Sequence, residues 1–321
     1  MTVVILAEER DISADQMVCA LRDLDVPVFR VDTARFPAQL SFNAELRGGN
    51  WDGELRTPHR TVELAAVRSI WFRSPTTFQF PRELSATERR HAHTEAKLGL
   101  GGVLASLPVL WVNHPSRLAD ASYKPAQLAA AAQHGLHVPP TLVTNEEHAV
   151  RRFATESEGG QILTKMLGAS SITEEGSRKI AFTRLISSAD LMDLRGVGVT
   201  AHQFQHWVPK KFDARLISAG ERQFAFSIEA GNAESYVDFR YDYSALTYER
   251  IDVPTAVRRG VRRFMAHFQL TYGAFDFVVS PDDRWTFLEC NPGGQYGWLE
   301  AATDAPLTAS LAELLAKGVD S

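Results

Sequence analysis

Two neighbouring segments near the C-terminus constrain the fold of this chain more than any other feature. Residues 274–279 and 285–290 have the period-two character of β-strands. Between them, the Pro-Asp-Asp sequence of residues 281–283 is typical of a turn. We therefore expect an antiparallel hairpin centred between residues 282 and 283.

This hairpin brings two carboxylates together. In the expected register Asp276 lies opposite Glu289, and Asn291 follows two residues later on the same face. Facing carboxylates on paired strands repel each other, and a divalent cation between them reverses that penalty. The alternative is an exposed hairpin whose acidic residues face water. The phenylalanines Phe275 and Phe277 beside Asp276 argue against it, because a buried carboxylate without a partner is costly.

The N-terminal part has the pattern of an α/β unit. Residues 3–7 form an apolar run typical of a strand covered on both faces, residues 15–24 have helical spacing, and residues 26–31 suggest a second strand. The G-x-G-x-x-G pattern of a dinucleotide site is missing after the first strand. We expect further strands and helices at residues 41–46, 51–57, 67–73, 83–107 and 110–113, and a domain boundary near residue 113.

The middle of the chain alternates short helices and strands. Pro125 predicts two short helices that meet at Lys124. Thr144 and Glu147 have the spacing of a capping box. After a strand at residues 161–165, we expect strands with a single further helix at residues 254–268.

Composition limits the classes of function. At about 150 residues per domain, 321 residues suggest about two domains. The net charge of −5 argues against coating nucleic acid, although not against a local basic groove. No apolar run approaches the roughly 18 residues of a membrane span, and the N-terminus lacks the basic region of a signal peptide. Two cysteines cannot form a disulfide framework. We expect a soluble, cytoplasmic protein without nucleic-acid or membrane partners.

Two lysines are candidates for phosphate binding. Lys124 lies at the helix junction, and Lys165 ends an apolar strand. A loop rich in Gly and Ser, residues 167–171, follows Lys165 and could donate backbone N–H groups to phosphates. The P-loop pattern G-x-x-x-x-G-K-[ST] does not occur. For either lysine alone, a solvated surface position is the alternative.

A third candidate segment, residues 203–210, ends in Pro209, which cannot continue a strand ladder. Its backbone could bond an adenine edge, with Gln205 assisting and Trp207 as an apolar wall. The alternative is an ordinary edge strand.

Two arginines follow an aspartate at i−2. These are Arg215 after Asp213 and Arg240 after Asp238. In a strand each pair shares a face, so the aspartate can orient the guanidinium for phosphate or carboxylate recognition. Structural ion pairs remain the alternative.

Together these segments resemble the ATP-grasp superfamily, from about Leu110 to the C-terminus. They are most similar to the ATP-grasp maturases of ribosomal peptides, the graspetide synthetases. The similarity rests on WVNHPSRLADASYKPAQLAAAAQHGLHVPPTLVTN, KMLGASSITEEG, QHWVPKKFDARL, YVDFR, YGAFDFVVSPDDRWTFLECNPGGQYGWLE and, nearer the N-terminus, SIWFRSP. The resemblance implies a mixed α/β and α+β fold: a pre-ATP-grasp domain at residues 1–113, then two α+β lobes, 114–203 and 204–321, that clamp ATP.

The resemblance also implies roles for individual residues. Lys124 and Lys165 would contact ATP phosphates, and Arg215 would stabilise the transferring phosphoryl group. Arg240 would lie near the acceptor or the acidic side chain of the substrate. The remaining residues would hold adenine and ribose (Gln205, the Trp207-Val208 backbone and Lys210) or Mg²⁺ (Asp276, Glu289 and Asn291).

The implied reaction closes a macrocycle. ATP converts an Asp or Glu side chain of a precursor peptide into an acyl phosphate, which a Ser or Thr hydroxyl or a Lys amine of the same peptide attacks. The peptide binds through a separate leader, for which residues 171–194 could form a wall, and the family suggests a homodimer. His202, His206 and Asp238 remain undecided as the general base.

Three other functions remain open. A carboxylate–amine ligase, which adds amino acids to a protein tail or joins small metabolites, would share all the ATP and Mg²⁺ residues. A scaffold that binds ATP without catalysis would not need all of these residues, so their presence argues against it. A structural or interaction protein that binds no nucleotide would leave the facing carboxylates unexplained.

Overall fold

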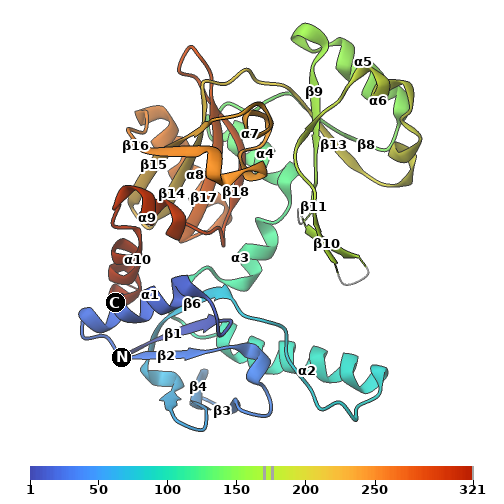
Figure 1. Ribbon diagram of the computed structural model, residues 1–321. Coiled ribbons are helices and arrows are strands. Elements are labelled where there is room, and N and C mark those ends of the chain that lie inside the picture. Colours follow the sequence, from blue (N-terminus) through green and yellow to red (C-terminus); the bar gives the residue numbers. More distant parts are fainter. Residues whose placement is uncertain (169–170, 175–176, 320–321) are drawn as a thin grey trace.

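The computed structural model describes residues 1–168, 171–174 and 177–319, with the side chains of residues 158 and 171–180 left out of the description (Figure 1). Its N-terminal part, a central lobe and a C-terminal lobe each contain a sheet of at least four strands. None of the helices in these described ranges combines the length and apolarity needed to cross a bilayer.

The N-terminal part is an α/β unit, as the sequence predicts. Its parallel sheet has the order β2-β1-β6-β7 and is accompanied by two helices. The strands predicted at residues 41–46 and 51–57 form a hairpin that turns at Gly48 and Gly49, both with positive φ, a conformation that glycine adopts readily. The bounds are β1 (Thr2–Ala7), α1 (Ile12–Asp23), β2 (Val28–Val31), η1 (Thr33–Arg35), β3 (Ser41–Arg47), β4 (Asn50–Arg56), β5 (Thr61–Glu63), η2 (Leu64–Ala66), β6 (Val67–Ser74), α2 (Ala86–Ala105) and β7 (Leu110–Val112).

Two short helices, α3 (Pro115–Asp120) and α4 (Lys124–Gln133), follow β7 and confirm the predicted break at Lys124. Each helix has a proline in its first turn, where no intrahelical donor is lost. Asn113 precedes them and is buried. Its carboxamide oxygen accepts bonds from the backbone N–H groups of Thr271 and Tyr272, and its nitrogen donates to the carbonyls of Tyr272 and Pro292. Asn113 thus fastens the N-terminal part to the C-terminal sheet.

The central lobe has a small antiparallel sheet of order β12-β9-β13-β8. The predicted capping box is wrong. Thr144 belongs to β8 and accepts a bond from the Glu146 N–H, while Glu147 is the first residue of α5 and not its third. The bounds are β8 (Thr141–Thr144), α5 (Glu147–Thr155), η3 (Glu158–Gly160), β9 (Ile162–Lys165), β10 (Ser171–Glu174), β11 (Ser177–Ile180), β12 (Arg184–Leu185), α6 (Ser188–Met192), η4 (Arg195–Val199) and β13 (His202–His206).

The C-terminal lobe is built on a five-stranded antiparallel sheet of order β16-β15-β14-β17-β18. The expectation of a single helix after residue 165 is wrong, because α6 of the central lobe and α7, α9 and α10 of the C-terminal lobe accompany α8. The bounds are β14 (Phe212–Ala219), β15 (Arg222–Ala230), α7 (Ala233–Val237), η5 (Phe239–Tyr241), η6 (Tyr243–Ala245), β16 (Leu246–Ile251), α8 (Thr255–Phe268), β17 (Tyr272–Val279), β18 (Trp285–Asn291), α9 (Gly297–Thr303) and α10 (Leu307–Lys317).

The two faces of this sheet have different neighbours. Along β17 the odd-numbered residues, such as Phe275 and Phe277, pack in one core with α8 and α4. On the other face, Tyr272 and Ala274 share a core with α1, α10 and the N-terminal sheet, and α10 lies beside α1 (Figure 1). Further along that same face the even-numbered Asp276 and Val278 line a cleft. One face of the sheet therefore serves both the N-terminal contact and the cleft.

Candidate functional site

A cleft of about 700 Å³ lies between the C-terminal sheet and the central lobe. This volume lies in the range of pockets that bind small molecules and cofactors. All the site residues predicted from the sequence line it: Lys124, Lys165, Gln205, Trp207, Val208, Lys210, Arg215, Arg240, Asp276, Glu289 and Asn291. The fold thus brings together side chains from both lobes and from the helix junction.

The predicted hairpin places Asp276 directly opposite Glu289. Beyond this pair a bulge shifts the register, because Phe277 pairs with Phe287 and leaves Leu288 as an extra residue. The predicted register therefore holds on the Asn291 side of the bulge and is off by one residue on the turn side. The bulge has a local effect on side-chain direction. Phe287 and Cys290 face the core, whereas the consecutive residues Leu288 and Glu289 both line the cleft.

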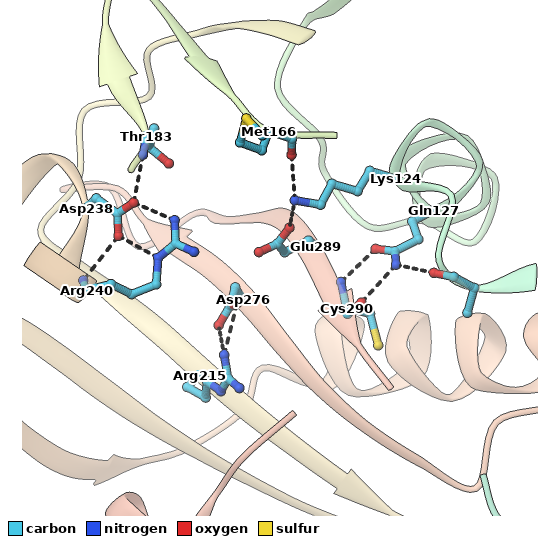
Figure 2. A network of polar contacts seen from close by, with 11 residues as sticks. Lys124, Gln127, Met166, Thr183, Arg215, Asp238, Arg240, Asp276, Glu289 and Cys290 are labelled. Atoms are coloured by element: carbon cyan, nitrogen blue, oxygen red, sulfur yellow. Dashed lines mark hydrogen bonds and ion pairs between the residues drawn. The ribbon is translucent and has the colours of Figure 1, made fainter. Parts of the chain in front are cut away.

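Each carboxylate of this pair has a cationic partner. The Arg215 Nη1 donates to both oxygens of Asp276 at 2.8 and 3.0 Å, and the Lys124 Nζ lies 2.8 Å from Glu289 Oε2 (Figure 2). Burial raises the pKa of Asp276, and Arg215 offsets this only in part. Burial alone would also raise the pKa of Glu289, but Lys165 and Lys124 outweigh it and lower that pKa. The pKa of Asp276 therefore lies above its ordinary value, and the pKa of Glu289 lies below its own.

Lys124 and Lys165 are the two cations that lower the pKa of Glu289. Lys124 donates to the carbonyl of Met166 at 2.8 Å, so it bridges β18 and the residue after β9 (Figure 2). Burial lowers the pKa of Lys165 to about 8, Glu289 opposes that shift and Lys124 adds to it. An anion bound in the cleft would favour the charged form of Lys165. Of the Gly- and Ser-rich loop after Lys165, Ala169 and Ser170 lie outside the described residues, and so does Gly176.

The two Asp–Arg pairs predicted at i−2 have different outcomes. Asp238 does orient Arg240, with bonds from Nε at 2.8 Å and from Nη2 at 2.6 Å, although in a short 3₁₀ turn and not in a strand. The pairing of Asp213 with Arg215 is wrong. Arg215 turns to Asp276 on the adjacent strand, and Asp213 instead accepts a 2.6 Å bond from Lys210.

The segment expected to hold adenine lies at the end of β13. Gln205 is buried, and its Nε2 donates to the Thr141 hydroxyl at 2.9 Å. The Trp207 N–H is used by the Gln161 carbonyl, whereas the Val208 N–H has no hydrogen-bond partner among the described residues. The N–H and C=O of one peptide group point in opposite directions, so the Trp207–Val208 peptide can offer a base edge only one of them.

Lys210, which the resemblance places near the ribose, has its ammonium group already paired within the protein. Its ammonium is buried against Asp213 and lies 6.0 Å from the ring centroid of Trp207 and 5.4 Å from that of Tyr236. Burial raises the pKa of Asp213 to about 6, even though Lys210 opposes the shift. The contacts of Lys210 stabilise the position of the Trp207 ring, and its contact with ribose remains a prediction.

The donors in the cleft suit both an ATP molecule and Mg²⁺. Asp276, Glu289 and Asn291 offer only oxygen ligands, the type that Mg²⁺ prefers, and a cation there would relieve the raised pKa of Asp276. Within the described residues no group of three His, Cys, Asp or Glu side chains could hold a metal by itself, so substrate phosphates would have to complete the coordination.

The three candidate bases are placed differently. Asp238 has a lowered pKa, because bonds from Arg240 and the Thr183 N–H outweigh the effect of burial, which alone would raise it. His206 lines the cleft, and its ring packs on Phe153 at a centroid distance of 4.3 Å. His202 is not among the residues that line it. The general base therefore stays unassigned.

The structure adds residues that the sequence reasoning missed. Gln295, Tyr243, Tyr248 and Trp298 line the cleft, and the Tyr248 and Trp298 rings lie 4.9 Å apart. Gln127 lies behind the cleft and bonds the backbone of Cys290. Its signal in the sequence was an amide three residues after Lys124, in an alanine-rich segment that also contains Gln133. Of the proposed leader wall at residues 171–194, the side chains of residues 171–180 lie outside the description.

Comparison with known proteins gives three findings. Residues 2–119 match the family described as the MvdD pre-ATP grasp domain. Curated proteins gave no significant match. The macrocyclase MdnC of Microcystis aeruginosa MRC, solved with the precursor peptide MdnA, is 30% identical with a TM-score of 0.86, over 99% of this chain and 100% of that chain.

Two further solved structures share the fold. The macrocyclase MdnB of Microcystis aeruginosa MRC is 26% identical over 98% of each chain, with a TM-score of 0.79. An ATP-grasp ligase of Chryseobacterium gregarium, solved with ADP and with a leader and core peptide, is 24% identical over 98% of this chain and 96% of that one, with a TM-score of 0.89. The full-length match to MdnC, the pre-ATP-grasp domain and the cleft lead to one conclusion: the chain belongs to the ATP-grasp macrocyclases of ribosomal peptides.

Proposed function

We propose that this protein uses ATP to activate Asp or Glu side chains of a ribosomal precursor peptide, and that it closes macrocycles between side chains of that peptide. The observation that carries the proposal is the single cleft in which two facing carboxylates lie among Lys124, Lys165, Arg215 and Arg240. The full-length similarity to a macrocyclase that was solved with its precursor peptide supports the choice of substrate.

The chemistry can be written with all atoms accounted for. A carboxylate oxygen of the peptide attacks the γ-phosphorus of ATP, ADP leaves, and an acyl phosphate forms. A Ser or Thr hydroxyl, or a Lys amine, then attacks the carbonyl carbon. Phosphate leaves with the former carboxylate oxygen, the nucleophile loses its proton, and the product is a cyclic ester or amide. The bond type depends on the nucleophile that the precursor supplies.

Each charged group has a role in this proposal. Lys124 and Lys165 neutralise the ATP phosphates, and Arg215, held by Asp276, stabilises the phosphoryl group in transfer. Arg240, oriented by Asp238, binds the peptide carboxylate or acyl phosphate. Asp276, Glu289 and Asn291 hold Mg²⁺, which when bound neutralises phosphate charge. Gln205, the Trp207-Val208 backbone and Lys210 form the nucleoside end.

The remaining assignments are also proposals. We propose a pre-ATP-grasp domain at residues 1–113, a central lobe at residues 114–206 and a C-terminal lobe at residues 207–321. The boundary at 203/204 expected from the sequence would divide β13, whose ladder partners among the described strands are β8 and β9 of the central lobe. We propose a homodimer by analogy with the family, and light scattering on the purified protein would test it. We propose a cytoplasmic location, since ATP is available there and both cysteines are free thiols.

Intact-mass spectrometry of the precursor encoded beside this protein tests the function. Incubation with ATP and Mg²⁺ should remove the mass of one water for each ring, and the loss should disappear without ATP. Lability of the product to hydroxide would identify esters. A gain of mass would instead support an amino-acid ligase, and ATP binding without any change in the peptide would support a silent scaffold.

A further inference from the structure

The strand that carries Glu289 and Asn291 is held from behind by a buried side chain. Gln127 of α4 is only 3% exposed. Its Oε1 accepts a bond from the Cys290 N–H at 2.8 Å, and its Nε2 donates to the Cys290 carbonyl at 2.8 Å and to the Ala121 carbonyl at 2.5 Å (Figure 2). All three bonds join the amide to backbone groups.

The position of Cys290 at the edge of the sheet explains why its backbone needs the bonds from Gln127. β18 is an edge strand of the sheet, with β17 on one side and, on the other, an isolated bridge between His137 and Thr286 near its N-terminal end. The N–H and C=O of an edge residue that point away from the sheet have no ladder partner and must find one elsewhere when they are buried. Gln127 supplies both partners at Cys290, much as another strand would. The residues on either side of Cys290 are Glu289 and Asn291, whose side chains line the cleft.

The same helix also reaches the site directly. Lys124, one turn before Gln127 on α4, lies 2.8 Å from Glu289 Oε2. Gln127 therefore fixes the distance between the helix that carries Lys124 and the strand that carries Glu289. Beyond Asn291, the Asn113 carboxamide donates to the Pro292 carbonyl at 2.7 Å, so the strand end is fastened on both sides of Asn291.

We propose that Gln127 is a positioning residue for the Mg²⁺ site. By clamping the backbone of Cys290 it sets the positions of the Glu289 and Asn291 oxygens relative to each other and to Lys124. The proposal rests on the proposed function, because that function makes these oxygens metal ligands. Groups that hold metal ligands in place contribute about 10- to 100-fold to metal affinity.

The test compares Gln127→Met with Leu128→Ala. The first keeps the length of the side chain and removes all three bonds. The second reduces the core packing of the same helix at the next residue, because Leu128 packs in the core and is not among the residues that line the cleft. Mn²⁺ serves as the probe, and its affinity is measured by electron paramagnetic resonance in the presence of ADP. ADP affinity without metal and the Tm are measured in parallel.

We expect Gln127→Met to lower the Mn²⁺ affinity about 10- to 100-fold and to leave the metal-free ADP affinity unchanged. Leu128→Ala should lower the Tm without this selective loss. If Gln127→Met does not fold, Gln127→Asn, which is too short to span both groups of Cys290, should show the same selective loss. Wild-type Mn²⁺ affinity in a folded Gln127 variant, or an equal loss in Leu128→Ala, would overturn the inference alone. A wild-type protein that binds no Mn²⁺ with ADP would overturn the proposed function as well.

Discussion

The two walls of the cleft are built in different ways. In the C-terminal wall, Arg215 and Asp276 lie within adjacent strands of a sheet with a large core, and Glu289 lies on the next strand. In the central wall, Lys165 is the last residue of β9, and Trp207 and Val208 follow the end of β13, backed by a smaller core. The hydrogen-bond register of the sheet fixes the positions of Arg215, Asp276 and Glu289. The residues of the central wall lie at or beyond the ends of their strands, so fewer backbone bonds fix their positions.

This difference suggests a division of work. The residues fixed by the sheet register are the carboxylate pair and Arg215. In the proposed function, charge moves beside these residues during phosphoryl transfer. In the proposed function, the groups at strand ends contact ATP: Lys165 contacts its phosphates, and the Trp207-Val208 backbone contacts its adenine. We therefore expect changes in the C-terminal wall to lower kcat and changes in the central wall to raise the KM for ATP.

Glu289→Gln should have the largest effect. It removes the charge of a proposed metal ligand and the partner of Lys124, and we expect ring formation to slow on the order of 10³-fold. Intact-mass measurement over time would give the rate. Asp283→Asn, at the exposed turn of the same hairpin, is the matched control and should keep the wild-type rate. Equal losses in both variants would contradict the assignment.

Arg215→Lys should follow, with a loss of about 100-fold in kcat. Lysine keeps the charge but cannot bond both oxygens of Asp276 and also the Gln295 carbonyl, as Arg215 does. Steady-state release of ADP would separate kcat from KM. Arg222→Lys on β15, where the arginine forms an exposed ion pair with Glu313, is the control. A rise in KM with unchanged kcat would contradict the proposed division.

The pH dependence of ATP binding tests Lys165. Its pKa of about 8 means that the charged form predominates below pH 8 and is lost above it. Because ATP is an anion that favours the charged form, its affinity should fall about tenfold from pH 7 to pH 9. Calorimetry at several pH values would measure this. Lys165→Arg should flatten the profile, and an unchanged slope in that variant would assign the titration to another group.

Val208→Pro should have the smallest effect of the four. It removes the one backbone N–H of this segment that has no partner among the described residues. Loss of one hydrogen bond should raise the KM for ATP about five- to tenfold, with little change in kcat. A large fall in kcat would show that the central wall also takes part in the chemistry.

The sequence predicted the facing carboxylates of the C-terminal wall because a turn and two alternating strands are local patterns. A count centred between residues 282 and 283 places Asp276 opposite Glu289, but the pairs next to the turn lie one residue off that count, so the agreement depends on a bulge. The bulge at Leu288 was not predictable in this way, since it depends on how both strands pack. The Asp213–Arg215 pairing failed for a similar reason: residues two apart share a face, but a partner on the neighbouring strand, Asp276, satisfies Arg215 instead.

Other misses have different origins. The leucines of α10, at positions 307, 311, 314 and 315, have helical spacing, so that helix was visible in the sequence. The role of Gln127 was not visible, because its partner Cys290 lies 163 positions away along the chain. Single polar contacts between distant segments depend on the packing of whole lobes, and a local pattern does not encode them.

Transfer of a heavy oxygen isotope tests the central claim most directly. A precursor whose Asp and Glu side-chain carboxyls carry the label is incubated with the protein, ATP and Mg²⁺, and the released phosphate is analysed by mass spectrometry. The account predicts one labelled oxygen in the phosphate for each ring closed, because the peptide carboxylate attacks the γ-phosphorus. Unlabelled phosphate, or label in AMP, would contradict activation through an acyl phosphate.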